Sequence, residues 1–273
     1  MKQITLKKAA EISGPGLHKG KINRVMISPS DADAGLLIRN AGCEYVLNPG
    51  LVADTKRGTT IKYKKSVLHT VEHMVSAIRG LGIDNAVITV EGDEPPAADG
   101  SSYPYVLALR KAGFKKLLKD KKFISIKEPV LVEDSGRYLA VLPFKGLKIS
   151  YFSDFSGYGI PPSDVTEEIT PMAYEKMISK ARTFGFKSEI GWLIKAGLIK
   201  GASLDNAILM DKGRPVKGTL RYLDELARHK ILDIAGDFGM LGANLNMHII
   251  AVKTGHKHNV EMAKKIWTQS GYR

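Results

Sequence analysis

The sequence predicts an α+β fold of two domains that meet near residue 120, and three observations support this prediction. Segments with strand character are followed by helical segments, and the same order then repeats in the second half. A basic run at residues 115–122 separates the two halves and is typical of a solvated connector. The chain has 273 residues, 44% of them hydrophobic, which is enough for two ordinary domains with their own cores.

The first half is expected to begin with strands joined by turns. Residues 2–67 alternate short apolar and polar runs, which glycine and proline interrupt. Apolar residues at positions 71, 74, 75 and 78 then follow helical spacing, and Gly80 and Gly82 supply the stop. Residues 83–90 return to strand character. A loop at 94–102, rich in proline, glycine and aspartate, precedes a second helix at 105–112.

The second half is expected to restart with strands and to end on a helix. The expected strands are residues 123–132, 138–143, 147–152, 206–210 and 247–253. The expected helices are residues 171–180, 187–196, 226–241 and 260–268. We find no repeat of fixed period in the sequence, only this repeated order of elements.

The helix expected at 226–241 carries polar residues on one face. At about 100° per residue, His229, Asp233 and Asp237 fall within roughly 80° of one another, and apolar residues fill the remaining arc. A histidine and a carboxylate one turn apart can grip one metal ion, because their side chains point the same way. All three residues are therefore candidate metal ligands.

A second candidate site lies in the first turn of the helix that begins near residue 71. His73 points away from the apolar stripe of this helix, and Glu72 lies on its flank. Hydrolytic sites often combine a metal-binding histidine with a glutamate that takes a proton from water. Considered alone, the pair Glu72-His73 is more often a helix start with solvated polar residues.

A third candidate is His256, which follows Thr254 and Gly255 at the expected end of a strand. This position is accessible, and the glycine makes its backbone adaptable. A nearby carboxylate such as Asp237 raises the pKa of a histidine, which then holds a proton ready for a leaving amine. Taken alone, His256 is more often an ordinary loop histidine.

Two further segments offer groups for a substrate. The Thr183 hydroxyl can donate to a developing oxyanion, and Phe184 and Phe186 can stack on a sugar or line an acyl channel. Ser203 lies in a turn with free backbone N–H groups and hydroxyls. Each segment alone is weak evidence, because a packed loop or a turn has the same composition.

Composition restricts the class of partner. The 41 basic and 28 acidic residues give a formal net charge of +13, which favours nucleic acid, an anionic membrane or phosphate-bearing substrates. The densest basic run lacks the interleaved aromatics of a nucleic-acid site. Cys43 is the only cysteine, so neither an internal disulfide nor a thiolate metal cluster is expected. We expect no signal peptide and no membrane span, and any membrane contact to be peripheral.

Nine motifs, taken together and in order, resemble the UDP-3-O-acyl-N-acetylglucosamine deacetylase family of lipid A biosynthesis. The resemblance covers nearly the whole chain. No single motif is decisive, but all nine in this order are specific for the family. The motifs lie at residues 13–18, 54–60, 70–73, 80–85, 99–101, 182–186, 203–207, 228–233 and 255–256.

The resemblance implies a role for each candidate residue. His73, His229 and Asp233 would hold the metal, and Glu72 would be the general base on the attacking water. The other implied roles are His256 as general acid, Asp237 as its orienting partner, Thr183 at the oxyanion, Phe184, Phe186, Lys230 and Ser203 at the substrate, and Lys253 near its phosphates.

The resemblance also implies a fold and a setting. It implies two similar layered α+β domains, residues 1–120 and 121–273, with helices packed between outer sheets and the active site between the domains. An insert at about 186–206 would form a passage for the acyl chain. Zn²⁺ would be the cofactor, although Fe²⁺ satisfies the same ligands. We expect a cytoplasmic monomer that acts on a UDP-linked acylated glucosamine, touches the anionic inner membrane at most peripherally and binds no nucleic acid.

Two alternatives remain beside the deacetylase. The chain can be a metal amidase for a different acylated amino sugar, or a non-catalytic protein that binds a nucleotide sugar. A base, an acid and an open metal site together favour an enzyme over a binding protein.

Overall fold

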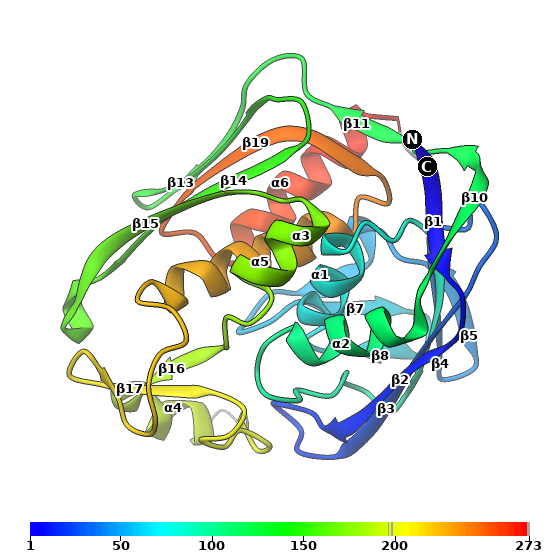
Figure 1. The fold of residues 1–273 in the computed structure, drawn as a ribbon. Coiled ribbons are helices and arrows are strands. Elements are labelled where there is room, and N and C mark those ends of the chain that lie inside the picture. The colour runs from blue at the N-terminus through cyan, green and yellow to red at the C-terminus, as the bar shows by residue number, and fades with distance from the viewer. Residues whose placement is uncertain (196, 198, 272–273) are drawn as a thin grey trace.

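The computed structural model describes residues 1–195, 197 and 199–271, and it packs helices between two larger sheets (Figure 1). The first sheet contains β2 (Ala10–Pro15), β3 (Ile22–Ser28), β4 (Leu36–Asn40), β5 (Cys43–Val46) and β9 (Ala86–Glu91). Their order across the sheet is β2–β3–β9–β4–β5. Buried and exposed residues alternate along β3, as expected for a strand with one face on a core.

The second sheet repeats this arrangement. It contains β11 (Phe123–Ser125), β12 (Val130–Asp134), β13 (Arg137–Pro143), β14 (Leu147–Phe155), β15 (Ile160–Glu168) and β19 (Asn244–Val252). Their order is β12–β13–β19–β14–β15, and β11 pairs with β19 in addition. β19 runs parallel to β14 and antiparallel to β13, as β9 runs parallel to β4 and antiparallel to β3.

Most of the helices form the layer between the sheets. These are α1 (Glu72–Gly80), α2 (Tyr103–Ala112), α5 (Glu225–Gly239) and α6 (His256–Gln269). The short α3 (Pro171–Ala173) is continued by a π-helical turn (Tyr174–Ile178), and the short α4 (Ile190–Lys195) lies outside this layer (Figure 1). α1 and α5 lie against each other so closely that a Cβ atom on Gly236 would be 2.2 Å from the Glu72 carbonyl oxygen. Apolar residues of both sheets, of α1, α2, α5 and α6 and of the π-helical turn form one continuous core.

Three smaller sheets and three single helical turns complete the secondary structure of the described residues. The sheets are β1 (Lys2–Leu6) with β10 (Phe114–Asp120), then β6 (Val52–Asp54), β7 (Thr60–Tyr63) and β8 (Ser66–Leu68), and finally β16 (Phe184–Phe186), β17 (Ile208–Asp211) and β18 (Arg214–Pro215). The turns are 3₁₀-helical at Pro49–Leu51, Ser156–Tyr158 and Lys187–Glu189. Among these residues, no helix has the length and apolar character needed to cross a bilayer.

The α+β prediction is confirmed, and so are most of the expected elements. The structure also differs from the expectation. The expected strand at 123–132 is two strands, β11 and β12, with residues 126–129 between them. The run at 115–122 is not a connector but largely strand β10, which pairs with β1 and leaves its lysines on an exposed ribbon. β15 was not expected, because Pro161 and Pro162 obscure it; an edge strand tolerates proline. α6 begins at His256 rather than at residue 260. Residue 196, the expected end of a helix, lies outside the described residues.

Candidate metal centre and active site

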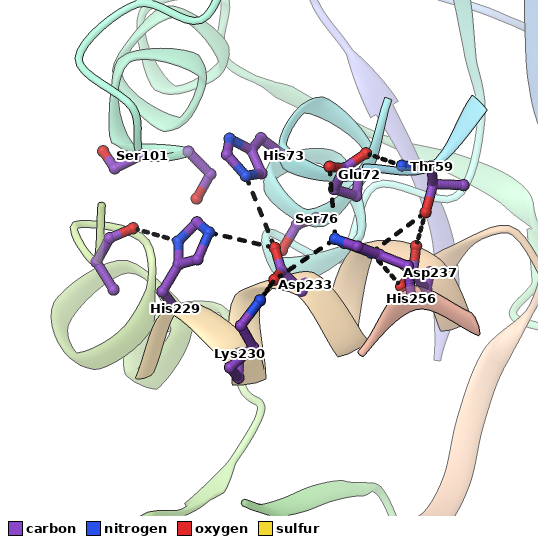
Figure 2. Close-up of polar contacts among 12 residues, drawn as sticks. Thr59, Glu72, His73, Ser76, Ser101, His229, Lys230, Asp233, Asp237 and His256 are labelled. Atoms are coloured by element: carbon purple, nitrogen blue, oxygen red, sulfur yellow. Dashed lines mark hydrogen bonds and ion pairs between the residues drawn. The ribbon is translucent and has the colours of Figure 1, made fainter. Parts of the chain in front are cut away.

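Helices α1 and α5 bring the polar residues of the two main motifs together at their contact. Glu72 and His73 open α1, and on α5 the residues His229, Asp233 and Asp237 follow one another at intervals of one turn. All five side chains are buried, and Figure 2 shows them facing one another across the helix pair. Buried ionisable groups that face one another are costly unless each has a partner, so this arrangement indicates a site.

Three of these residues have the geometry of a metal-binding group. The Oδ1 atom of Asp233 lies 3.4 Å from Nε2 of His229 and 3.7 Å from Nε2 of His73. This oxygen is buried and has no hydrogen-bond partner in the described structure. The Nδ1 atom of His229 lies 3.1 Å from the Ala181 carbonyl oxygen, to which it donates, so the lone pair of Nε2 faces Asp233. Two imidazole nitrogens and one carboxylate oxygen therefore converge on one point, a donor set that suits a divalent transition metal.

The charges of these groups suit a cation. Burial lowers the pKa of His229 to about 3, so its imidazole is neutral and can act as a ligand. Burial by itself raises the pKa of Asp233, but neighbouring positive charge, from Lys230 and the protonated His256, outweighs it and holds that pKa well below the usual range. The carboxylate is therefore ionised. Lys230, 2.8 Å from Oδ2 of Asp233, supplies part of the positive charge that this carboxylate needs.

An acid–base pair lies beside this group. Burial raises the pKa of Glu72. Burial lowers the pKa of His256, but the carboxylates of Asp237, Asp233 and Glu72 outweigh it and raise the value to about 9. Nδ1 of His256 lies 2.9 Å from Asp237, whereas its Nε2 faces Glu72 at 3.8 Å and Asp233 at 3.7 Å. His256 is not the accessible loop residue that we expected, because its side chain is only 10% exposed at the start of α6.

The site opens into one large cleft, and most of the residues predicted to contact the substrate line this cleft. Thr183, Phe184, Phe186, Lys230 and Lys253 all line it, together with every residue of the acid–base and metal-binding groups except Asp237. Aromatic and charged side chains form much of its remaining wall, beside smaller polar and apolar residues. They include Arg57, Arg137, Tyr151, Asp154, Phe155, Tyr158, Glu189 and Lys257.

The lining residues have defined contacts. The Lys230 ammonium lies 5.3 Å from the centre of the Phe184 ring, and Phe186 stacks on Tyr158 with 3.6 Å between ring centres. Lys253 has a positive φ of 55° and its Nζ lies 3.4 Å from Asp154. Ser203 is different: it is exposed, outside this cleft, and its hydroxyl accepts a hydrogen bond from the Asp205 backbone.

Two features of the site were not found from the sequence. The fully buried Thr59 donates its backbone N–H to Glu72 and its hydroxyl to Asp237. It lies within the motif at 54–60, but a threonine in a loop carries no signal for this role. The second is the salt bridge between the partly buried Arg182 and the fully buried Glu225, which holds the segment that leads to Thr183.

Comparisons with known proteins agree over nearly the full length of the chain. A family model described as UDP-3-O-acyl N-acetylglycosamine deacetylase matches residues 3–268. A UDP-3-O-acyl-N-acetylglucosamine deacetylase of Saccharophagus degradans is 41% identical over 266 residues, covering 95% of this chain and 88% of its own. Proteins of the same name from Teredinibacter turnerae and Nautilia profundicola are 39% and 35% identical, cover 97% and 100% of this chain, and are themselves covered over 90% and 94% of their length.

Proposed function

This chain belongs to the UDP-3-O-acyl N-acetylglycosamine deacetylase family, and we propose that its cleft hydrolyses the acetamide of UDP-3-O-(3-hydroxyacyl)-N-acetylglucosamine and releases acetate. The chain is thus a metal-dependent deacetylase of lipid A biosynthesis. The observation that carries the proposal is the pairing, in one cleft, of a three-ligand metal-binding group with a separate carboxylate–histidine pair. A protein that only binds a nucleotide sugar has no need of both.

His73, His229 and Asp233 would hold the metal, and we propose Zn²⁺ as the ion. Two neutral imidazoles and one carboxylate are a ligand set that zinc accepts, with a further position left open for catalysis. When bound there, a divalent ion supplies Lewis acidity toward water and toward the amide carbonyl. Fe²⁺ satisfies the same donors, so metal analysis of the purified protein decides between the two ions.

The other residues of the site would transfer protons or stabilise the charges that form during hydrolysis. Glu72, whose pKa burial raises, takes a proton from the attacking water. The Thr183 hydroxyl donates a hydrogen bond to the oxyanion that forms on the acetamide carbon. His256, which is protonated at neutral pH, gives its proton to the glucosamine nitrogen as the carbon–nitrogen bond breaks. Asp237 accepts from Nδ1 of His256, so Nε2 keeps its proton pointed at the cleft.

The walls of the cleft fit the rest of this substrate. Lys230 and Lys253 bring positive charge to a diphosphate, and Phe184 and Phe186 offer aromatic surface to a sugar or an acyl chain. The segment at about 186–206 would form the passage for the acyl chain. Ser203 lies outside the cleft and has no part in this proposal.

Measurement of acetate release from UDP-3-O-acyl-N-acetylglucosamine, over a series of acyl lengths, tests the function. We expect turnover with about one equivalent of bound metal, and its loss on chelation. The variant Glu72→Gln should keep the metal but lose about 10²–10⁴-fold in kcat. His73→Ala should lose the metal itself.

Other results would change the proposal. Turnover of a different acylated amino sugar, with none of this one, favours the alternative amidase. A protein without metal whose activity survives His73→Ala contradicts the mechanism, and wild-type turnover by Glu72→Gln removes Glu72 from its role.

We also propose that the chain is a cytoplasmic monomer that binds no nucleic acid and meets an anionic membrane only peripherally. The excess of basic residues supports attraction to an anionic surface. Flotation with vesicles of anionic or zwitterionic lipid, together with sedimentation, tests this proposal.

A further inference from the structure

Thr59 lies between the two proton-handling groups without reaching the cleft. It is fully buried, and the residues that line the cleft do not include it. Its backbone N–H donates to Oε2 of Glu72 over 2.9 Å, and its hydroxyl donates to Oδ1 of Asp237 over 2.6 Å. One residue therefore contacts a carboxylate of α1 and a carboxylate of α5 (Figure 2).

The Thr59 backbone is itself held in place. Its carbonyl oxygen accepts a hydrogen bond of 3.2 Å from Val71, the residue before α1, and strand β7 begins at the next residue. A side chain at Gly58, the residue before it, would crowd the site, because a Cβ there would lie 3.1 Å from the Glu72 carboxylate. The position of the hydroxyl is thus set by fixed neighbours rather than by a mobile loop.

In each of the two carboxylates, one oxygen accepts a hydrogen bond from Thr59 and the other oxygen faces His256. Thr59 occupies Oε2 of Glu72, so Oε1 is the oxygen that faces His256, at 3.8 Å. It also occupies Oδ1 of Asp237, which leaves Oδ2 for Nδ1 of His256 and for the Asn259 amide, each at 2.9 Å. A carboxylate with one oxygen fixed can rotate less, and its other oxygen is then held toward its reaction partner.

We propose that Thr59 is a positioning residue that sets the relative orientation of the general base Glu72 and the His256–Asp237 acid pair. Substitution can remove only the side-chain contacts of Thr59, which are its hydrogen bond to Asp237 and the 3.3 Å contact of its hydroxyl with Nδ1 of His256, so the effect of mutation should pass through the His256–Asp237 pair. This inference rests on the proposed function. It adds a residue that touches neither substrate nor metal-binding group.

The experiment compares Thr59→Val with Thr59→Ser. Valine keeps the shape but removes the donor, and serine keeps the donor. We expect Thr59→Val to lower kcat by about 10–100-fold, with KM and metal content changed by less than about twofold. Thr59→Ser should stay within about threefold of the wild type. Thr60 is a matched control, because its hydroxyl contacts His69 instead of the site; Thr60→Val should retain full activity.

A double-mutant cycle separates positioning from general damage. In an Asp237→Ala background, Thr59→Val should cause little further loss of kcat, because the acceptor of the Thr59 hydroxyl is already absent. The proposal is overturned if Thr59→Val retains wild-type kcat, if serine is as damaging as valine, or if the two losses multiply. Absence of turnover in the wild-type protein would instead contradict the proposed function.

Discussion

The protonation of His256 is governed by the carboxylates around its buried ring. Three acids face the imidazole, and their combined charge more than offsets the cost of burying the charged form. At pH 7 the side chain is therefore an acid that is already loaded with its proton. This is the state that is needed to protonate a poor leaving group such as an amine.

We expect kcat/KM to fall as pH rises through the pKa of His256. The folded pKa of about 9 lies above the usual 6.5, so the protonated form persists through neutral pH and is lost toward about 9. A metal ion at the neighbouring metal-binding group would repel the imidazolium and lower its pKa. The pKa measured from the alkaline limb of the pH profile should therefore be at or below about 9. Asp237→Asn removes a negative neighbour and should move the alkaline limb to lower pH. An unmoved limb would contradict the assignment of the acid to His256.

Single residues differ in how far the sequence reveals them. Glu72, His73, His229, Asp233 and Asp237 were predictable, because helical spacing places them on shared faces and their side chains are chemically distinctive. Thr59 and Ala181 act through a hydroxyl or a carbonyl that many residues offer. Only the three-dimensional contacts show those roles.

At the level of elements, the contact between α1 and α5 determines the distance between the ligands. Gly236 lies where the two helices touch, and no side chain fits there because the Glu72 carbonyl occupies the space. His73 is on one helix and Asp233 on the other, with 3.7 Å between Nε2 of the histidine and Oδ1 of the aspartate. Any added atom at the contact would separate them.

We expect Gly236→Ala to lower the free energy of unfolding by roughly 1–3 kcal/mol through overpacking, even though alanine favours a helix. Metal affinity should fall with it, because the ligands move apart. Urea unfolding and metal titration measure the two effects. Gly191→Ala is the control: this exposed helical glycine has nothing within 4 Å of an added Cβ. Equal stability of Gly236→Ala and the wild type would show that the helices can separate freely.

Elements with clear periodicity were predicted, and those that depend on tertiary pairing were not. The apolar spacing of α1 and the valines and isoleucines of β19 are local signals. β10 consists mainly of lysine and leucine, and its pairing with β1 across more than a hundred residues of sequence is what makes it a strand. Its composition alone is typical of a solvated segment.

The whole molecule is organised around two sheets of the same strand order. β10 pairs with the N-terminal β1, whereas β11 pairs with β19 of the second sheet, so the pairing of strands changes between residues 120 and 123. We propose domains of 1–120 and 121–273 on this basis. Their shared hydrophobic core indicates that the two halves fold against each other rather than independently.

We expect the net charge of +13 to act on the substrate at long range. Raising the salt concentration from about 0.01 M to about 1 M shortens the Debye length from about 30 Å to about 3 Å. kcat/KM for a diphosphate substrate should then fall by roughly tenfold, mainly through KM. A substrate analogue that lacks the uridine diphosphate should show little change under the same conditions. Equal salt dependence for both would mean that the charge does not steer the substrate.

The three proposed metal ligands come from two helices that are far apart in the sequence, and this affects how strongly the two halves of the protein hold together. His73 comes from α1, within the first 80 residues, and His229 and Asp233 come from α5, more than 150 residues after His73. An ion held by all three is a cross-link that closes a very long loop of chain. Because it binds the folded protein and not the separated helices, its binding energy adds directly to the cohesion of the two halves. Loading with metal should therefore slow hydrogen exchange along α1 and α5 together. The same ion that activates the substrate would also stabilise the contact between these two helices.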